Sequence, residues 1–132
     1  MTHPLRILCI VFFVLSCSHT GALSVHENAA IVAVLTQQAD AWNRGDLKGF
    51  MDGYSRSPDL VFTSGGNVRR GWQAAYDRYR KSYADKTLMG TLLFSDFEIS
   101  SLGPDAAMVL GRWMLSDTPK ASGGVFTLVM RR

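Results

Sequence analysis

The sequence has little cysteine and little histidine, and most of both lies near its start. It contains two cysteines, Cys9 and Cys17, and three histidines, of which only His26 follows residue 22. The rest of the chain therefore offers no disulfide, no thiol nucleophile and too few ligands for a zinc site. It also has no Gly-x-Ser-x-Gly turn for a Ser-His-Asp triad. We expect no metal, and the sequence indicates no cofactor.

Charge of one sign is also scarce. Lys and Arg total 14 and Asp and Glu total 11, a net charge of +3. The basic residues between 69 and 81 are interleaved with Asp77 and followed by Asp85, so they form no continuous stripe that could follow phosphates. We expect no nucleic-acid partner. A length of 132 residues with 47% hydrophobic residues predicts one domain with one core.

The only long apolar run is Ile7 to Leu15, which is too short to span a bilayer. It follows a short basic segment and precedes small residues up to Ala22, the layout of a secretory signal peptide over residues 1–22. Alternatively, Val14-Leu15-Ser16-Cys17 resembles a lipobox, with a lipoprotein signal over 1–16 and a lipidated Cys17. An uncleaved N-terminus is the third possibility. We expect an exported protein of a bacterial periplasm or cell envelope, in contact with a membrane only through such an anchor.

Apolar spacing predicts three helices in the body of the chain, residues 23–132. The first covers 27–43, because apolar positions recur there at steps of three and four. Asp46 suits the N-cap of a second helix over 47–53. The third runs from Gly71 to about Ala84. Its aromatic residues share one face, and they are Trp72, Tyr76, Tyr79 and Tyr83.

Strands follow the helices. Residues 60–63 and 68–70 flank a Ser64-Gly65-Gly66-Asn67 turn, which predicts a hairpin. Longer strands are predicted over 88–99, 106–115 and 125–130. Helices followed by antiparallel strands give an α+β fold with helices packed on one face of a curved sheet. Residues 106–115 are apolar at both parities, so we expect the other face to be covered too, by a second subunit in a homodimer.

Four segments resemble the SnoaL-like, domain-of-unknown-function branch of the nuclear-transport-factor-2-like superfamily. They are Ala41-Trp42-Asn43-Arg44-Gly45-Asp46, Ser57-Pro58-Asp59-Leu60-Val61-Phe62, Arg70-Gly71-Trp72 and Gly124-Val125-Phe126-Thr127-Leu128-Val129. The resemblance spans about 27–132. It implies a cone-shaped fold with a cavity at the open end, and homodimers through the sheet. Relatives include ketosteroid isomerase-like, dehydratase and polyketide cyclase enzymes as well as non-catalytic binding modules.

The sequence departs from this family in two ways. The first strand, Phe62-Thr63-Ser64, has no carboxylate where isomerase-like members carry a general base, and a hydroxyl cannot take that role alone. The sequence also stops at Arg132, where related sequences continue into another strand. We therefore expect the domain to lack the final strand of the family.

Candidate site residues are aromatic side chains and one arginine. The predicted ligand-binding residues are Trp42, Tyr54, Phe62, Trp72, Tyr76, Tyr79 and Arg112. Each aromatic residue has ordinary core packing as its alternative, although a lining with several polar rings could orient a small ligand. Arg112, among apolar neighbours in a strand, either binds an anion or pairs with Asp96 or Glu98.

The weak catalytic candidates are Asp59, Tyr76 and Arg112. The alternative role of Asp59 is that of a turn residue. Arg69 and Arg70 could clamp a ligand, and their alternative role is a solvated strand end. We expect an exported small-molecule-binding domain. The alternatives are an isomerase-, cyclase- or dehydratase-type enzyme acting on a small apolar or carbonyl substrate through a Tyr- or Arg-stabilised oxyanion, and a dimeric scaffold or truncated remnant with no pocket.

Overall fold

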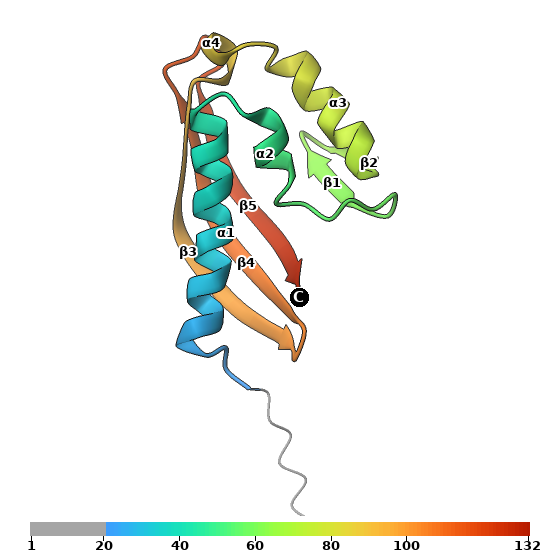
Figure 1. Cartoon of the computed structure of the whole chain (residues 1–132), viewed down its shortest axis with the longest axis vertical. Coiled ribbons are helices and arrows are strands. Elements are labelled where there is room, and N and C mark those ends of the chain that lie inside the picture. The colour runs from blue at the N-terminus through green and yellow to red at the C-terminus, as the bar shows by residue number, and fades with distance from the viewer. Residues whose placement is uncertain (1–20) are drawn as a thin grey trace, which may run out of the picture.

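The protein is described here by a computed structural model that covers residues 21–132 (Figure 1). Residues 1–20 of the predicted signal peptide, including the lipidation candidate Cys17, lie outside the described residues.

Helix α1, Val25–Asn43, begins two residues before the predicted start. The Ser24 side chain accepts a hydrogen bond from the Glu27 backbone N–H, and the Glu27 carboxylate accepts one from the Ser24 N–H. This reciprocal pair is a capping box, which satisfies two orphan donors of the first turn and fixes the start of the helix. Further along α1, Leu35 and Trp42 are buried.

Helix α2, Leu47–Met51, is capped by Asp46 as predicted, since the carboxylate accepts from the Gly49 N–H at 2.8 Å. Helix α3 covers Trp72–Ser82. Between them, strands β1, Val61–Ser64, and β2, Asn67–Arg70, form the predicted hairpin. These elements lie beside the C-terminal half of α1 (Figure 1).

The predicted start of the strand over 88–99 is wrong. Residues 88 and 89 belong to a short helix, α4, Lys86–Met89, and not to the strand predicted over 88–99. The Asp85 carboxylate caps this turn by accepting from the Leu88 N–H at 2.9 Å. Gly90 then takes a positive φ of 61° and redirects the chain into strand β3, Thr91–Gly103.

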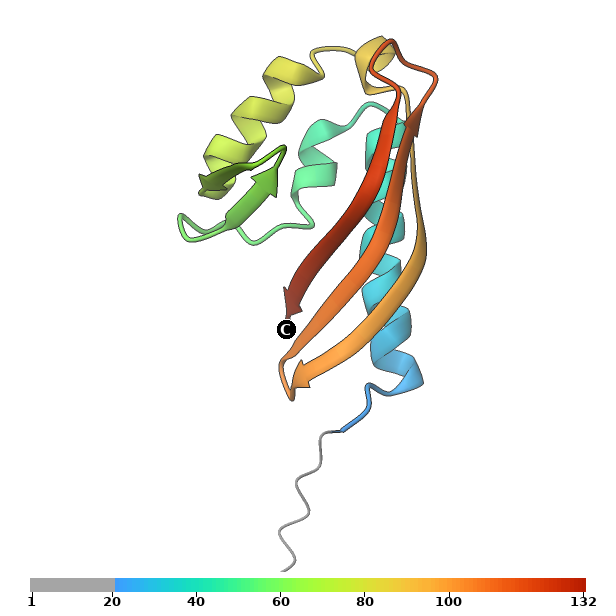
Figure 2. The same ribbon diagram turned by 180° about the vertical axis from the view of Figure 1, so that it is seen from behind.

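The long strands form an antiparallel sheet in the order β3-β4-β5, with β4 covering Ala106–Ser116 and β5 covering Ser122–Arg131. Strand β5 thus begins three residues before the predicted 125. The β3–β4 register shifts between Ser95 and Glu98, where Asp96 has a φ of 53°. Such a bulge bends a strand, and Figure 2 shows the three strands curving together with α1 along one face.

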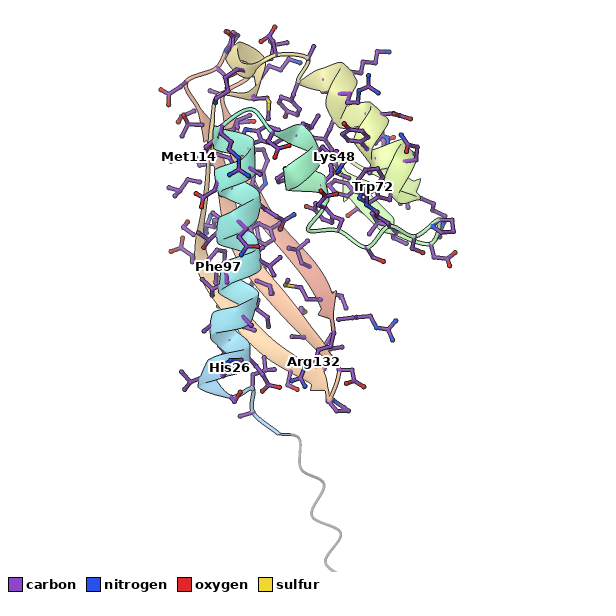
Figure 3. The ribbon with its side chains drawn as sticks, viewed as in Figure 1. His26, Lys48, Trp72, Phe97, Met114 and Arg132 are labelled. Atoms are coloured by element: carbon purple, nitrogen blue, oxygen red, sulfur yellow. The ribbon has the colours of Figure 1, made fainter. Side chains whose placement is uncertain are left out.

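The two faces of the sheet differ. On the face toward α1, Leu92, Val109 and Leu115 are buried. On the other face, large apolar side chains are about half exposed, namely Leu93, Met114, Val125 and Val129. Met114 lies on the side of the sheet away from α2 and α3 (Figure 3). The predicted α+β fold with helices on one face of a curved sheet is confirmed.

Candidate functional site

Most of the predicted cavity-lining rings pack against one another. Trp42 lies edge-on to Tyr83 and Tyr79, with ring centroids 4.8 and 6.0 Å apart. Tyr54 and Tyr79 lie 5.6 and 5.7 Å from Phe62 in the same manner. Edge-to-face pairs at these distances are the usual packing of aromatic cores. Each of these rings thus packs against other rings of the same cluster.

The polar atoms of this aromatic cluster are directed to the backbone. The indole N–H of Trp42 donates to the Met89 carbonyl at 2.8 Å, and that of Trp72 donates to the Met51 carbonyl at 2.8 Å. Trp42 and Trp72 are buried. Their indoles tie α4 to α1 and α3 to α2, and thereby position the helices around the site described next.

Burial also keeps two phenols neutral. It raises the pKa of Tyr54 to about 12, against a smaller opposing effect of a hydrogen bond from Gln38. Burial likewise raises the pKa of Tyr79, and the nearby phenols of Tyr54 and Tyr83 raise it further. Burial is the largest cause in both cases, so both phenols are neutral at physiological pH.

A groove of about 730 Å³ lies between α2, α3 and α4, and we call it the α2–α4 groove. Its less polar part is formed by Tyr76, Tyr83 and Met89. Its charged lining comes from two sets of residues. The basic residues are Lys48, Arg80, Lys81 and Lys86, and the acidic residues are Asp46, Asp77 and Asp85. Figure 3 shows Lys48 on the side of α2 near α3.

The acids of the groove are already engaged. Asp46 and Asp85 cap α2 and α4, and the Asp77 carboxylate accepts from the Gln73 side-chain amide at 3.0 Å. These hydrogen bonds stabilise the local backbone and the exposed surface of α3.

The basic side chains of the groove have fewer interaction partners than its acidic side chains. Lys48 pairs with Asp52 outside the groove at 3.2 Å, and the Lys86 ammonium donates to the Gly90 carbonyl. The Arg80 guanidinium lies over the Tyr76 ring, 5.7 Å from its centroid. Within residues 21–132, no carboxylate lies within ion-pair distance of Arg80 or Lys81.

A second, mostly apolar hollow of about 620 Å³ lies between the start of α1 and the ends of β4 and β5. Ile31, Val34 and Met130 contribute to it, and an ion pair between Glu27 and Arg132 lies at its border. His26 and Arg132 mark this end of the molecule in Figure 3. It contains none of the predicted site residues.

Arg112 lies far from the aromatic cluster. Its parity along β4 is that of Met114, so it is on the sheet face away from α1, where its Nε is 3.6 Å from the Asp96 carboxylate. Its side chain is 64% exposed and that of Asp96 is 70% exposed. Of the two alternatives weighed from the sequence, the structure has the ion pair.

The remaining predicted residues are also at the surface or in the groove. Asp59 is exposed in a turn, with its N–H donating to the Ser57 hydroxyl at 3.0 Å. Tyr76 is the single predicted ligand-binding residue that lines the α2–α4 groove. Arg80, which also lines the groove, was not among the predicted residues. It lies four residues after Tyr76, and this i,i+4 spacing places both side chains on one face of the helix, so it could have been found from the sequence.

Among residues 21–132, no group of three or more His, Cys, Asp or Glu side chains is arranged to hold a metal ion. No helix in the same stretch has the length and apolar character needed to cross a membrane.

Similar solved structures were found. An NTF-2-like protein of unknown function from Shewanella oneidensis MR-1 is 42% identical, over 79% of this chain and 86% of that one, with a TM-score of 0.75. The chain belongs to the NTF-2-like family. This identity and coverage are well beyond a likeness of fold alone.

Two more distant structures share the NTF-2-like architecture. A Nostoc punctiforme domain of unknown function with a cystatin-like fold is 20% identical over 83% of this chain and 70% of that one, with a TM-score of 0.64. A putative calcium/calmodulin-dependent protein kinase II association domain from Xanthomonas campestris is 19% identical over 77% and 74%, with a TM-score of 0.55. No family model and no curated protein matches the sequence.

Proposed function

We propose that this NTF-2-like protein is an exported small-molecule-binding protein and that its ligand occupies the α2–α4 groove. The observation that carries the proposal is the groove itself, about 730 Å³ with tyrosine rings and charged groups in one lining. Ligand sites in proteins span roughly 300–1,000 Å³ and combine apolar walls with a few polar groups. The volume and the lining of this groove fit that description.

Binding fits the geometry better than catalysis does. A general base must lie within hydrogen-bond reach of the proton it removes. The first strand carries Phe62, Thr63 and Ser64, without an acid. Two of the three acids in the groove are helix caps. The carboxylates of these two caps already accept backbone N–H hydrogen bonds that hold the starts of α2 and α4.

The test is to fill the groove. Ala84 lines it and is exposed, so Ala84→Trp should occupy ligand space without disturbing the core. Ala74 is exposed on α3 outside the groove, which makes Ala74→Trp the matched control. Native mass spectrometry of the protein from its own host should show a retained ligand in the parent and in Ala74→Trp, and none in Ala84→Trp.

A thermal-shift screen with a library of small metabolites gives a second measurement. Compounds that stabilise the parent should not stabilise Ala84→Trp, since ligand binding to the native state raises the melting temperature. If Ala84→Trp retains both the ligand and the thermal shifts, the groove is not the binding site.

Export is tested on the full-length chain. In a bacterial host, the mature protein should begin at Leu23, or at a lipid-modified Cys17, because the apolar run Ile7 to Leu15 has the length of a signal-peptide core. Recovery of the chain in the cytoplasm with residues 1–22 intact would contradict export without affecting the proposed groove.

A further inference from the structure

We propose that the ligand of the α2–α4 groove is an organic anion, with a planar apolar body and a carboxylate, sulfonate or phosphate group. This inference rests on the proposed function and adds the chemical class of the ligand. It draws on three observations, namely the unpaired cations of the groove, its tyrosine wall, and the charge of the segment that forms it.

Arg80 and Lys81 supply the first observation. Both line the groove, and neither is within ion-pair distance of a carboxylate in residues 21–132. Cations on one wall of a concave surface focus the positive potential there. The groove has three acids, Asp46, Asp77 and Asp85, against four cations, so its lining keeps a net positive charge of one. The most favourable position for an anionic group is therefore beside Arg80 and Lys81.

Arg80 is also held in place. Its guanidinium lies over the Tyr76 ring, and the Tyr76 ring packs on Trp72 with centroids 5.0 Å apart. Trp72 is fixed by its hydrogen bond to the Met51 carbonyl. A guanidinium held against a ring loses less conformational entropy when it binds a carboxylate or phosphate, and its planar fork suits those groups.

Tyr83 supplies the apolar half of the site. Its ring packs edge-on against Trp42 and stacks on Tyr79, with the Lys120 ammonium 5.4 Å from its centroid, and Tyr83 also lines the groove. Met89, buried beneath it, adds a polarisable surface. Aromatic and thioether side chains favour contact with a flat apolar body. The groove thus has an apolar part and a cationic part next to each other.

The charge of the surrounding segment points the same way. Residues 44–86, which contain all the charged residues of the groove, include nine Lys or Arg and five Asp or Glu, a net charge of +4. The other described residues, 21–43 and 87–132, include four Lys or Arg and six Asp or Glu, a net charge of −2. Such an asymmetry attracts anions toward the groove end of the molecule.

The test uses two fluorescent probes with nearly the same rings. 1-Anilinonaphthalene-8-sulfonate carries an anionic group, and N-phenyl-1-naphthylamine lacks it. The anionic probe should bind the parent protein about tenfold more tightly than the neutral probe at about 0.01 M ionic strength. This difference should largely disappear at about 1 M, because the screening length falls from about 30 Å to about 3 Å.

Variants locate the binding. Arg80→Gln with Lys81→Gln should weaken the anionic probe about fivefold, the upper end of what exposed charge pairs contribute, and should leave the neutral probe unchanged. Arg78→Gln, on the same helix but outside the groove, is the matched charge control and should change neither. Val129→Thr controls for probe bound to the exposed face of the sheet, and circular dichroism checks that each variant is folded.

Two failures can be told apart. If both probes bind equally, are blocked by Ala84→Trp and are insensitive to Arg80→Gln with Lys81→Gln, the anion preference is wrong and the groove remains a binding site. If Ala84→Trp blocks neither probe, the groove is not the site, and the proposed function fails together with the inference.

Discussion

Tyr54 and Tyr79 show how burial changes the ionisation of single residues. Both phenols lie among other rings rather than beside an acid, and desolvation is the largest cause of their raised pKa values. Desolvation penalises the charged form of any group, so a buried phenol stays neutral at physiological pH. In this environment the two tyrosines stabilise the aromatic cluster as neutral phenols.

The raised pKa values predict a loss of stability at alkaline pH. The pKa of Tyr54 is about 12 in the folded state against 10.0 in an exposed phenol, so the unfolded chain releases its proton first. The stabilisation is complete below about pH 10 and is lost as the pH rises toward 12, by at most about 1.4 kcal/mol per pH unit for one group. Urea unfolding at several alkaline pH values measures this slope.

Tyr54→Phe should make that slope shallower, because phenylalanine cannot ionise in the unfolded chain. Circular dichroism at neutral pH serves as the control that the variant is folded. An unchanged alkaline slope in Tyr54→Phe would show that this phenol is not desolvated as the structure has it.

Single residues also show where sequence reasoning stops. Asp46 was predicted as a helix cap, and the structure confirms it, because the carboxylate and the N–H that donates to it are neighbours in sequence. The surroundings of Arg112 depend instead on a strand register that includes a bulge at Asp96. Nothing local in the sequence encodes that register, so an anion site and an ion pair could not be distinguished.

Among the elements, the short helix α4 was not predicted. The residues 88–99 are mostly apolar, and this pattern predicted one continuous strand. The structure instead begins with a capped turn and changes direction at Gly90, where φ is 61°. A Cβ atom at this position would lie 2.1 Å from the Ser116 carbonyl oxygen, so the close approach of β4 requires glycine.

Gly90→Ala should therefore destabilise the protein by about 3 kcal/mol, since it combines positive-φ strain with a clash against backbone. Gly65→Ala is the matched control. Gly65 also has a positive φ, of 56°, but a Cβ there would meet nothing within 4 Å, and we expect a cost of about 1 kcal/mol. Chemical denaturation measures both, and equal losses would mean that the contact with Ser116 is not made.

The other element boundaries show the same division between local and distant information. The start of α1 was predicted at residue 27, two residues late, although the Ser24–Glu27 capping box that fixes it is a local sequence feature. The hairpin turn at Gly65-Gly66 was predicted from its residues and has positive φ values at both glycines. The α2–α4 groove was not predicted, because its lining is brought together by the packing of three separate helices.

At the scale of the whole molecule, the face of the sheet away from α1 exposes several large apolar side chains. Leu93 and Met114 are directly opposite each other on β3 and β4, and both are about half exposed. Met108 pairs in the same way with Val129, which is 64% exposed. The exposed Arg112–Asp96 ion pair lies between these two apolar pairs. Exposed apolar surface of this kind is uncommon on a monomer and is typical of contact sites.

We propose that two copies of the chain cover this face by packing their sheets together, and we expect the chain from Leu23 onward to be a dimer by light scattering. Val129→Glu places a charge in the proposed contact and should give a monomer, because an unpaired carboxylate is costly to desolvate. Val25→Glu is the control, since Val25 is 87% exposed on α1, away from the sheet, and should leave the dimer intact. A parent protein that is monomeric at high concentration would contradict the dimer, and a Val129→Glu variant that stays dimeric would place the contact elsewhere.

The α2–α4 groove lies between helices on the opposite side of the sheet from this face. Probe binding in the groove should therefore be the same in Val129→Glu as in the parent, so that assembly and ligand binding can be measured independently.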